Sequence, residues 1–441
     1  MRRVLIVSPH FPPTNAPDHQ RVRMSLPYFR ENGWDPVVLA VDAACVEAPT
    51  DPQLADTVPP DVPVHRVRAL PARWTRVAGL GNLGYRAWFQ LNAAGARLLR
   101  DGQFDLVYFS TTQFVITALG RRWQRRFGVP YVVDIQDPWR TDYYERPGAP
   151  PPPGGWKYRF ARWQAARLEE RSWHGAAGFV SVSGDYLEQL RARYAWFGAR
   201  PSALIPFGAS EADFELARAQ RELAPAYPAE PGAVHLVSVG AVGPIMRTAL
   251  EFLFAGVRNL RATHPAAAAR LRLHFIGTSY APGARAGLSV LPVAEACGVA
   301  DLVREEPGRV GYFTAIKTML AADALVILGS DDPAYNPSKI ASCFLAGQPA
   351  LALTPAGSAL DRMVRELDFA TVAIWPAPEG VATVTEFLHQ LLTNPSGVQP
   401  AARNWAAFAA THNARARTRQ QCQLFDLALA GNNRPARRPA P

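Results

Sequence analysis

Lys339 stands at the start of a predicted helix, where its positive charge suits the binding of an anion. The sequence around it indicates a strand at 324–328, a polar loop, a helix that ends at a glycine, and a second strand at 350–353. In such a βαβ unit, ligands meet the amino end of the helix, where free backbone N–H groups favour negative charge. Pro337 and Ser338 suit this helix start. We therefore expect a phosphate group at this loop.

A second candidate loop follows the predicted strand at 234–239, in the sequence "VGAVGPIMRTALEF". Gly240 and Gly243 let the backbone approach a ligand closely, and Arg247 stands near the start of the next helix. Two interpretations are open. The loop is either a tight turn with a solvated arginine or a binding site for a diphosphate.

Apolar strand runs that alternate with helical stretches must position these loops. The alternation runs through residues 2–183, is interrupted by a segment rich in Pro, Gly and charge, and resumes from 234. The predicted fold is therefore α/β, with two Rossmann-like doubly wound domains. The expected parts are a first domain at 1–204, a linker at 205–232, a second domain at 233–402, a closing helix at 403–430 and a disordered tail at 431–441.

Bulk composition limits the classes of protein that the sequence can encode. The 441 residues are 48% hydrophobic, enough for two cores, and no apolar run approaches the 18 residues of a membrane span. We therefore expect a soluble, cytoplasmic protein. Four cysteines without CxxC or His-rich spacing indicate neither a zinc site nor a disulfide framework, and we expect no metal and no cofactor.

The net charge of +10 is concentrated in the first half of the chain. Residues 1–200 carry 26 Lys and Arg against 18 Asp and Glu, whereas residues 201–441 carry 21 against 19. A basic surface of this kind suits anionic lipid, a phosphorylated acceptor or nucleic acid. Nucleic acid is the least favoured, because no zinc finger, helix-turn-helix or RNP-like signature is present.

Several segments together resemble glycosyltransferases of the GT-B fold that are related to glycosyltransferase family four. The segment "NPSKIASCFLAGQPALAL" is similar to their donor-loop helix. Other similar segments stand in the same order along nearly the whole chain: "SPHFPPTNAPDHQRVRM", "VVDIQDPW", "VSVSGDY", "IPFGASEADF" and "VSVGAVG". The resemblance implies a nucleotide-sugar site in the second domain. Its candidate residues are Gly240, Gly243, Arg247, Thr278, Asp332, Tyr335, Ser338, Lys339 and Ser342.

The sequence departs from the family pattern at the donor site. The position three after Lys339 commonly holds a Glu that binds the ribose hydroxyls, and here it is Ser342, which lacks a charged bidentate acceptor. Ribose recognition is then weaker or is rerouted, for example through Asp331 or Asp332. The usual Arg and Lys of the first glycine loop are also replaced, and Arg247 is the neighbouring substitute.

Four residues of the first domain are candidates for catalysis. His10 and His19 flank a Pro-rich loop after the first predicted strand, where the family closes over the sugar and the acceptor. Asp134 and Asp137 end a largely apolar strand, where carboxylates are costly unless they face a wet cleft or have partners. They either bind an acceptor hydroxyl or cap the next turn.

Two segments, 70–102 and 121–127, interleave Arg with Trp, Tyr and Phe. Such segments lie at membrane interfaces, or they are ordinary helices with aromatic residues in the core.

The resemblance implies a hexosyltransferase-like, metal-independent enzyme that moves a sugar from a nucleoside diphosphate sugar to a hydroxyl acceptor with retention. A lipid-linked glycan or polysaccharide precursor is the acceptor we favour, with the protein peripheral at the inner membrane face. Two alternatives remain open: a sugar-nucleotide epimerase of the same fold, and a degenerate glycosyltransferase that acts as a non-catalytic partner.

Overall fold

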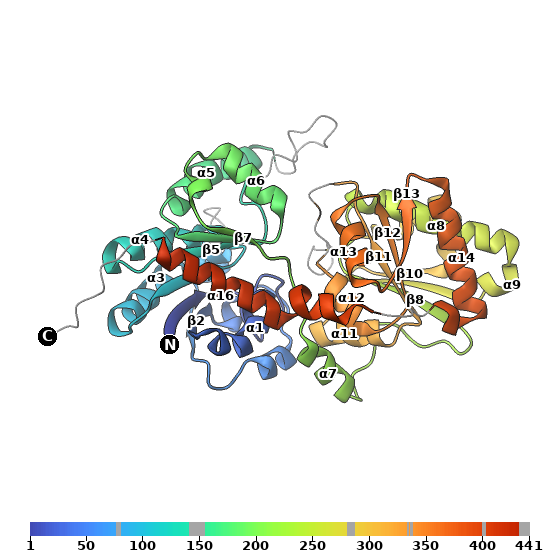
Figure 1. Cartoon of the computed structure of the whole chain (residues 1–441), viewed down its shortest axis with the longest axis horizontal. Helices are drawn as coiled ribbons and strands as arrows, with labels where there is room; N and C mark the ends of the chain where they lie inside the picture. The colour runs from blue at the N-terminus through green and yellow to red at the C-terminus, as the bar shows by residue number, and fades with distance from the viewer. Residues whose placement is uncertain are drawn as a thin grey trace. The chain divides into compact units, whose positions relative to one another are not determined.

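The computed structural model describes residues 1–75, 81–140, 155–279, 287–332, 335, 338–398 and 403–431. The chain divides into two compact units (Figure 1). Unit 1 comprises Met1–Pro206 and the described residues from Arg415 onward, and unit 2 comprises Phe207–Ala414. Each unit is built on one parallel β-sheet, so the predicted α/β fold with two Rossmann-like sheets is confirmed.

The sheet of unit 1 has seven parallel strands in the order β3-β2-β1-β4-β5-β6-β7. The strand order reverses between β1 and β4, and such a reversal leaves a crevice at the carboxyl ends of the two strands. The strands are β1 (Arg2–Val7), β2 (Trp34–Val41), β3 (Val64–Val67), β4 (Leu106–Ser110), β5 (Tyr131–Ile135), β6 (Gly178–Ser181) and β7 (Ser202–Leu204).

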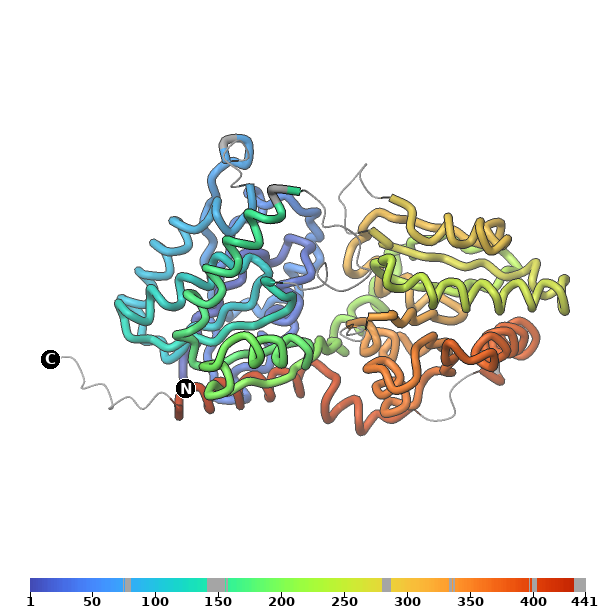
Figure 2. Tube along the Cα trace, turned by 90° about the horizontal axis from the view of Figure 1, so that it is seen from above, coloured from blue at the N-terminus to red at the C-terminus, as the bar shows by residue number. Residues whose placement is uncertain are grey.

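Helices cover both faces of this sheet, as the alternation along β1 shows. Leu5 and Val7 belong to an apolar cluster with residues of α3 and α4, whereas Val4 and Ile6 pack with residues of α1 and α16. The α-helices of unit 1 are α1 (Gln20–Ser25), α2 (Ala72–Thr75), α3 (Leu83–Asp101), α4 (Ala118–Phe127), α5 (Trp156–Trp173), α6 (Gly184–Arg193) and α16 (Ala414–Ala430). In Figure 2, α16 (red) runs along unit 1 beside the amino-terminal segment.

The sheet of unit 2 has six parallel strands in the order β10-β9-β8-β11-β12-β13, which reverses between β8 and β11. The strands are β8 (Val234–Val239), β9 (Leu271–Ile276), β10 (Val303–Glu306), β11 (Ala324–Leu328), β12 (Ala350–Pro355) and β13 (Thr371–Trp375). The α-helices are α7 (Glu211–Ala219), α8 (Arg247–Thr263), α9 (Pro265–Ala268), α10 (Leu291–Ala296), α11 (Tyr312–Leu320), α12 (Ile340–Ala346), α13 (Ala359–Leu367), α14 (Pro378–Thr393) and α15 (Trp405–Ala407).

The segment expected to be a linker, 205–232, contains a helix instead. The Ser210 hydroxyl accepts a hydrogen bond from the Asp213 amide and so caps α7, whose Phe214 and Ala217 are buried. Unit 2 accordingly begins at Phe207 rather than at 233.

The expected closing helix at 403–430 is broken in two. After α15, a π-helical turn at Phe408–His412 leads to Asn413, which is extended and pairs with Ala209. Phe408 stacks on Phe344 with ring centroids 4.6 Å apart. This packing within unit 2 overrides the helical propensity of the segment, and the long helix begins only at Ala414.

Candidate functional site

A pocket lies at the point where the strand order of unit 2 reverses. The ends of β8 and β11 line it, together with the loop after β8 and with Tyr335, Lys339 and Cys343. The predicted βαβ unit is confirmed here: β11 and β12 are parallel neighbours, and Gly347, at φ +86°, ends α12. Helix α12 begins one residue after Lys339, and Pro337 lies outside the described residues.

The Lys339 ammonium lies directly against Gly240 in this pocket. Gly240 has a φ of +121°, and a methyl group placed on it would lie 1.4 Å from Lys339 Nζ. The positive φ therefore favours glycine, and a larger residue would also displace the Lys339 side chain from its present position. Among the described residues, no carboxylate pairs with the ammonium and no oxygen accepts a hydrogen bond from it.

Burial of the ammonium is the main reason that the pKa of Lys339 is lowered from 10.5 to about 8; Cys343 acts to raise this pKa, and the nearby charge of Arg309 acts to lower it. The Lys339 residue as a whole is exposed, so water screens part of this effect. A second positive charge near an unpaired ammonium is unfavourable by itself and becomes favourable once an anion binds. Arg309 lies between β10 and α11 and was not among the predicted site residues.

Two other predicted donor-site residues already have partners in unit 2. Arg247 is the first residue of α8, and its Nε lies 2.7 Å from the Glu251 carboxylate, with 63% of the arginine side chain exposed. The Thr278 hydroxyl donates to Glu305 at 2.5 Å. Arg247 can leave its exposed ion pair easily, whereas Thr278 is buried and helps to hold Glu305.

Glu305 is fixed by the backbone as well. Burial acts to raise its pKa, but the Ser289, Val290 and Leu291 amides and the Thr278 hydroxyl donate hydrogen bonds to it, and the pKa is lowered. The carboxylate therefore caps the start of α10 as an anion.

Of the remaining predicted donor residues, Tyr335 lines the pocket, whereas Gly243, Asp332, Ser338 and Ser342 are not among its lining residues. Ser338 is exposed and Ser342 is half-buried, and among described residues neither side chain has a hydrogen bond. The Asp332 amide donates to the Ser330 hydroxyl, and the Tyr335 amide donates to the Asp332 carbonyl. Gly243 has a φ of −96° and room for a side chain, so its backbone does not require glycine.

Unit 1 has a polar cluster at its own strand reversal, built around Asp18. The His10 Nδ1 lies 2.9 and 3.0 Å from the two Asp18 oxygens, and Thr111 and Thr112, which follow β4, donate to the same carboxylate. Asp18 is 2% exposed, and although burial acts to raise its pKa, His10 and the other donors hold it below its ordinary value. An anionic Asp18 thus fixes the His10 ring through Nδ1.

His19 and Asp134 have structural partners. His19 is fully buried and donates from Nε2 to the Thr14 carbonyl at 2.7 Å, and burial lowers its pKa to about 3. Asp134 forms a buried ion pair with Arg21 at 2.9 Å and accepts a hydrogen bond from Ser110. These contacts argue against a direct part in chemistry for either residue.

Asp137 is different, because it is exposed as a whole residue. Burial of its carboxyl raises its pKa to about 6, and the Asp18 charge adds to the shift. Water screens part of this effect, but the upward direction fits a carboxyl that exchanges a proton near neutral pH.

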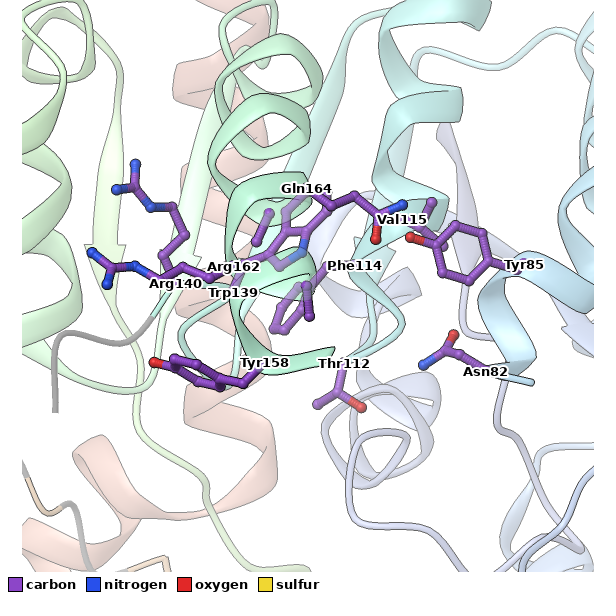
Figure 3. Close-up of a pocket in the computed structure, with 12 residues that line it drawn as sticks. Asn82, Tyr85, Thr112, Phe114, Val115, Trp139, Arg140, Tyr158, Arg162 and Gln164 are labelled. Carbon is purple, nitrogen blue, oxygen red and sulfur yellow. The ribbon is translucent and has the colours of Figure 1, made fainter. Parts of the chain in front are cut away.

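A larger cavity of about 240 Å³ lies in unit 1 and was not predicted from the sequence (Figure 3). Trp139 and Phe114 form its apolar wall, stacked with centroids 5.5 Å apart. Figure 3 shows the guanidinium groups of Arg140 and Arg162 on one side of this wall, with Tyr85 and Asn82 on the opposite side.

In the described parts of the chain, no group of three or more His, Cys, Asp or Glu side chains is arranged to hold a metal ion, and no helix is long and apolar enough to cross a membrane.

Comparisons with solved structures identify the fold. The chain is similar to Anabaena HepE in complex with UDP, with 13% identity, a TM-score of 0.56, and coverage of 96% of this chain and 99% of that one. It is also similar to a UDP-forming α,α-trehalose-phosphate synthase from Burkholderia xenovorans in complex with glucose-6-phosphate, with 14% identity, a TM-score of 0.58, and coverage of 96% and 100%. An E. coli structure bound with UDP-2-fluoro glucose has 12% identity, a TM-score of 0.57, and coverage of 97% and 99%. The chain therefore has the GT-B fold of glycosyltransferases.

A family model matches most of unit 1 by sequence. Residues 19–208 match the glycosyl transferase 4-like domain, so the predicted resemblance to family-four glycosyltransferases is confirmed. No curated protein matches the chain by sequence.

Proposed function

We propose that the protein is a glycosyltransferase that binds a nucleoside diphosphate sugar at the β8–β11 pocket and transfers the sugar to a hydroxyl acceptor. The observation that carries this proposal is the Lys339 ammonium, which lies against Gly240 at the strand reversal of unit 2 without a carboxylate partner among the described residues. The structures of similar fold that were solved with UDP or a UDP-sugar support this choice of donor.

In this proposal, Lys339 and Arg309 stabilise the negative charge that develops on the leaving diphosphate. Helix α12 has only seven residues, so the cations contribute more than its dipole does. Arg247 adds a third cation if it exchanges Glu251 for the diphosphate. Charge stabilisation by side chains alone fits transfer without a metal, and the likeness to family four supports retention.

His10 is the residue of unit 1 that we propose to contact the sugar or the acceptor. Asp18 holds its ring through Nδ1 at the strand reversal of unit 1. Asp137, with its raised pKa, is the second candidate for proton exchange with the acceptor.

Isothermal titration of the purified protein with UDP, GDP and ADP tests the donor site. We expect at least one of them to bind, and Lys339→Ala to weaken that binding. Equal affinity of mutant and wild type would remove the donor assignment.

Product analysis with a panel of nucleotide sugars separates this proposal from the two alternatives. An epimerase alters the sugar without an acceptor, and a non-catalytic partner turns over none. The half-buried Ser342 in place of a ribose-binding Glu is the feature that favours the non-catalytic reading.

We also propose a peripheral position at an anionic membrane, with a lipid-linked acceptor. On α5, Phe160 and Trp163 are 55% and 52% exposed and stack with centroids 5.9 Å apart, and Arg167 lies 4.6 Å above Trp163. Aromatic rings beside arginines suit the headgroup region. Segment 121–127 supports the proposal less, because its Trp123 is 1% exposed and belongs to the core.

Cosedimentation with anionic vesicles tests the membrane proposal. Binding should fall with added salt and fall again in the double variant Phe160→Ser/Trp163→Ser. Leu427→Ser, which changes a 59% exposed leucine on α16 of the same unit, is the matched control and should bind like the wild type. If the wild-type protein does not bind the vesicles even at low salt, a soluble acceptor becomes the better proposal.

A further inference from the structure

The cavity of unit 1 combines an aromatic wall, several hydrogen-bonding groups and two guanidinium groups. Trp139 and Phe114 contribute a stacked pair of aromatic rings to the lining, and Gln164, Asn82 and Thr112 supply amide and hydroxyl groups. An apolar surface with a few polar groups around it is the usual composition of a small-molecule site. Amides and hydroxyls in such a site suit a ligand with several hydroxyl groups.

The two arginines of the cavity favour a ligand that also carries negative charge. Figure 3 shows the Arg140 and Arg162 guanidinium groups on the same side. The Arg140 Nη1 lies 3.5 Å from the Tyr194 hydroxyl, and that hydroxyl donates to Glu169 at 2.9 Å.

Glu169 interacts with the charges of both Arg140 and Arg193, so one carboxylate serves two guanidinium groups. Arg193 forms an ion pair with it at 2.9 Å, and burial raises the pKa of Glu169 despite the two nearby arginines. The Arg140 Nε is buried, and among described residues nothing accepts a hydrogen bond from it. A planar guanidinium with an unused donor beside a cavity matches the geometry of a bound phosphate.

Thr112 connects this cavity to the polar cluster at the strand reversal. It lines the cavity, and both its backbone N–H and its hydroxyl donate to Asp18 at 3.2 Å. Asp18 in turn holds His10. A ligand in the cavity would therefore lie next to the residues that we propose to meet the acceptor hydroxyl.

We propose that this cavity is the acceptor site and that the acceptor is a hydroxyl-rich molecule that carries a phosphate group, with Arg140 and Arg162 binding the phosphate and Trp139 packing against the sugar ring. The inference rests on the proposed glycosyltransferase function and names the substrate class for it. A soluble sugar phosphate and a lipid-linked sugar phosphate share this chemistry.

The test is a set of binding titrations with three probes: glucose 6-phosphate, glucose, and farnesyl phosphate in detergent micelles. They are carried out in the Lys339→Ala protein, so that phosphate binding at the donor pocket does not contribute. We expect a phosphorylated probe to bind at least tenfold more tightly than glucose. Preference for glucose 6-phosphate indicates a soluble acceptor, and preference for farnesyl phosphate indicates a lipid-linked one.

Arg162→Gln and Arg140→Gln should each abolish this preference for phosphate. Arg162 is an exposed residue of α5, so its replacement should leave the fold intact and keeps the test valid if Arg140→Gln is unstable. Arg167→Gln is the matched control, because Arg167 is on the same helix but contacts Trp163 outside the cavity, and it should retain the preference.

Equal binding of phosphorylated and unphosphorylated probes, binding of no probe, or a preference that survives both arginine variants would overturn the inference. UDP titration of the protein with Lys339 intact distinguishes this failure from failure of the proposed function. If UDP binds normally but the cavity shows no preference for phosphate, the acceptor inference fails and the donor-site proposal is retained.

Discussion

The unusual environment of Lys339 predicts that nucleoside diphosphate binding depends on pH above neutrality. The pKa of Lys339 is lowered to about 8 by burial, so the ammonium is mostly charged at pH 7 and mostly neutral at pH 9. If only the charged form binds the diphosphate, the apparent affinity follows the charged fraction, which falls from about 0.9 to about 0.1 and weakens binding about tenfold. Phosphate groups, with a second pKa of about 6, are already ionised throughout this range.

Isothermal titration with UDP at pH 7, 8 and 9 measures the effect. Lys339→Ala should bind more weakly at pH 7, by about 1.5–3 kcal/mol for the lost charge-assisted bonds, and should show no further loss up to pH 9. Lys339→Arg is the matched control, because a guanidinium stays charged across the range. A wild-type affinity that stays constant from pH 7 to pH 9 would refute the idea that burial sets the state of Lys339.

Three further outcomes follow from the described contacts. Gly240→Ala should weaken UDP binding in calorimetry, because the methyl group displaces the Lys339 ammonium, and should lower the unfolding free energy by about 1–3 kcal/mol, because of the positive φ; a variant that binds UDP normally would contradict this role of Lys339. Ser342→Glu should change the affinity for ribonucleotides. The affinity should rise if the ribose hydroxyls lack an acceptor, and fall if Asp332 already accepts their hydrogen bonds. An unchanged dissociation constant would place the ribose elsewhere. His19, whose pKa is lowered to about 3, stays neutral in the folded protein, so its contribution to the unfolding free energy is complete above the unfolded pKa and declines as pH falls, by roughly 2 kcal/mol at pH 5. In urea unfolding, His19→Gln should therefore lose less unfolding free energy than the wild type between pH 7 and pH 5. An equal loss in the two proteins would count against this role of His19.

Most of the fold could be predicted because buried parallel strands leave a continuous apolar signature. The runs at β1, β5 and β11 were each recognisable without their neighbours. Strand β7 was missed since it has only three residues and its Leu204 is 51% exposed. Helix α7 was missed because Pro and Gly flank it and conceal its cap.

Site residues that belong to a short sequence motif could be predicted, whereas those that only the fold brings together could not. Gly240 and Lys339 could be proposed since each belongs to a short motif with a recognisable loop. The Asp18 cluster could not, because Thr112 is 94 residues away in sequence and only the sheet order brings the two together. The charge of Arg140 had no signal in the sequence, since its significance depends on the cavity beside it.

Helix α16 supplies part of the core of unit 1 from the far end of the chain. Phe425 packs against Phe29, Trp34 and Tyr108, with ring centroids 4.9–6.2 Å apart, and Gln421 donates to the Ser25 hydroxyl. During synthesis, the core formed by the first 206 residues therefore stays incomplete until α16 leaves the ribosome, after all of unit 2 has emerged. We expect unit 2 to complete its folding first, and a fragment that stops before residue 414 to expose an aromatic surface and aggregate.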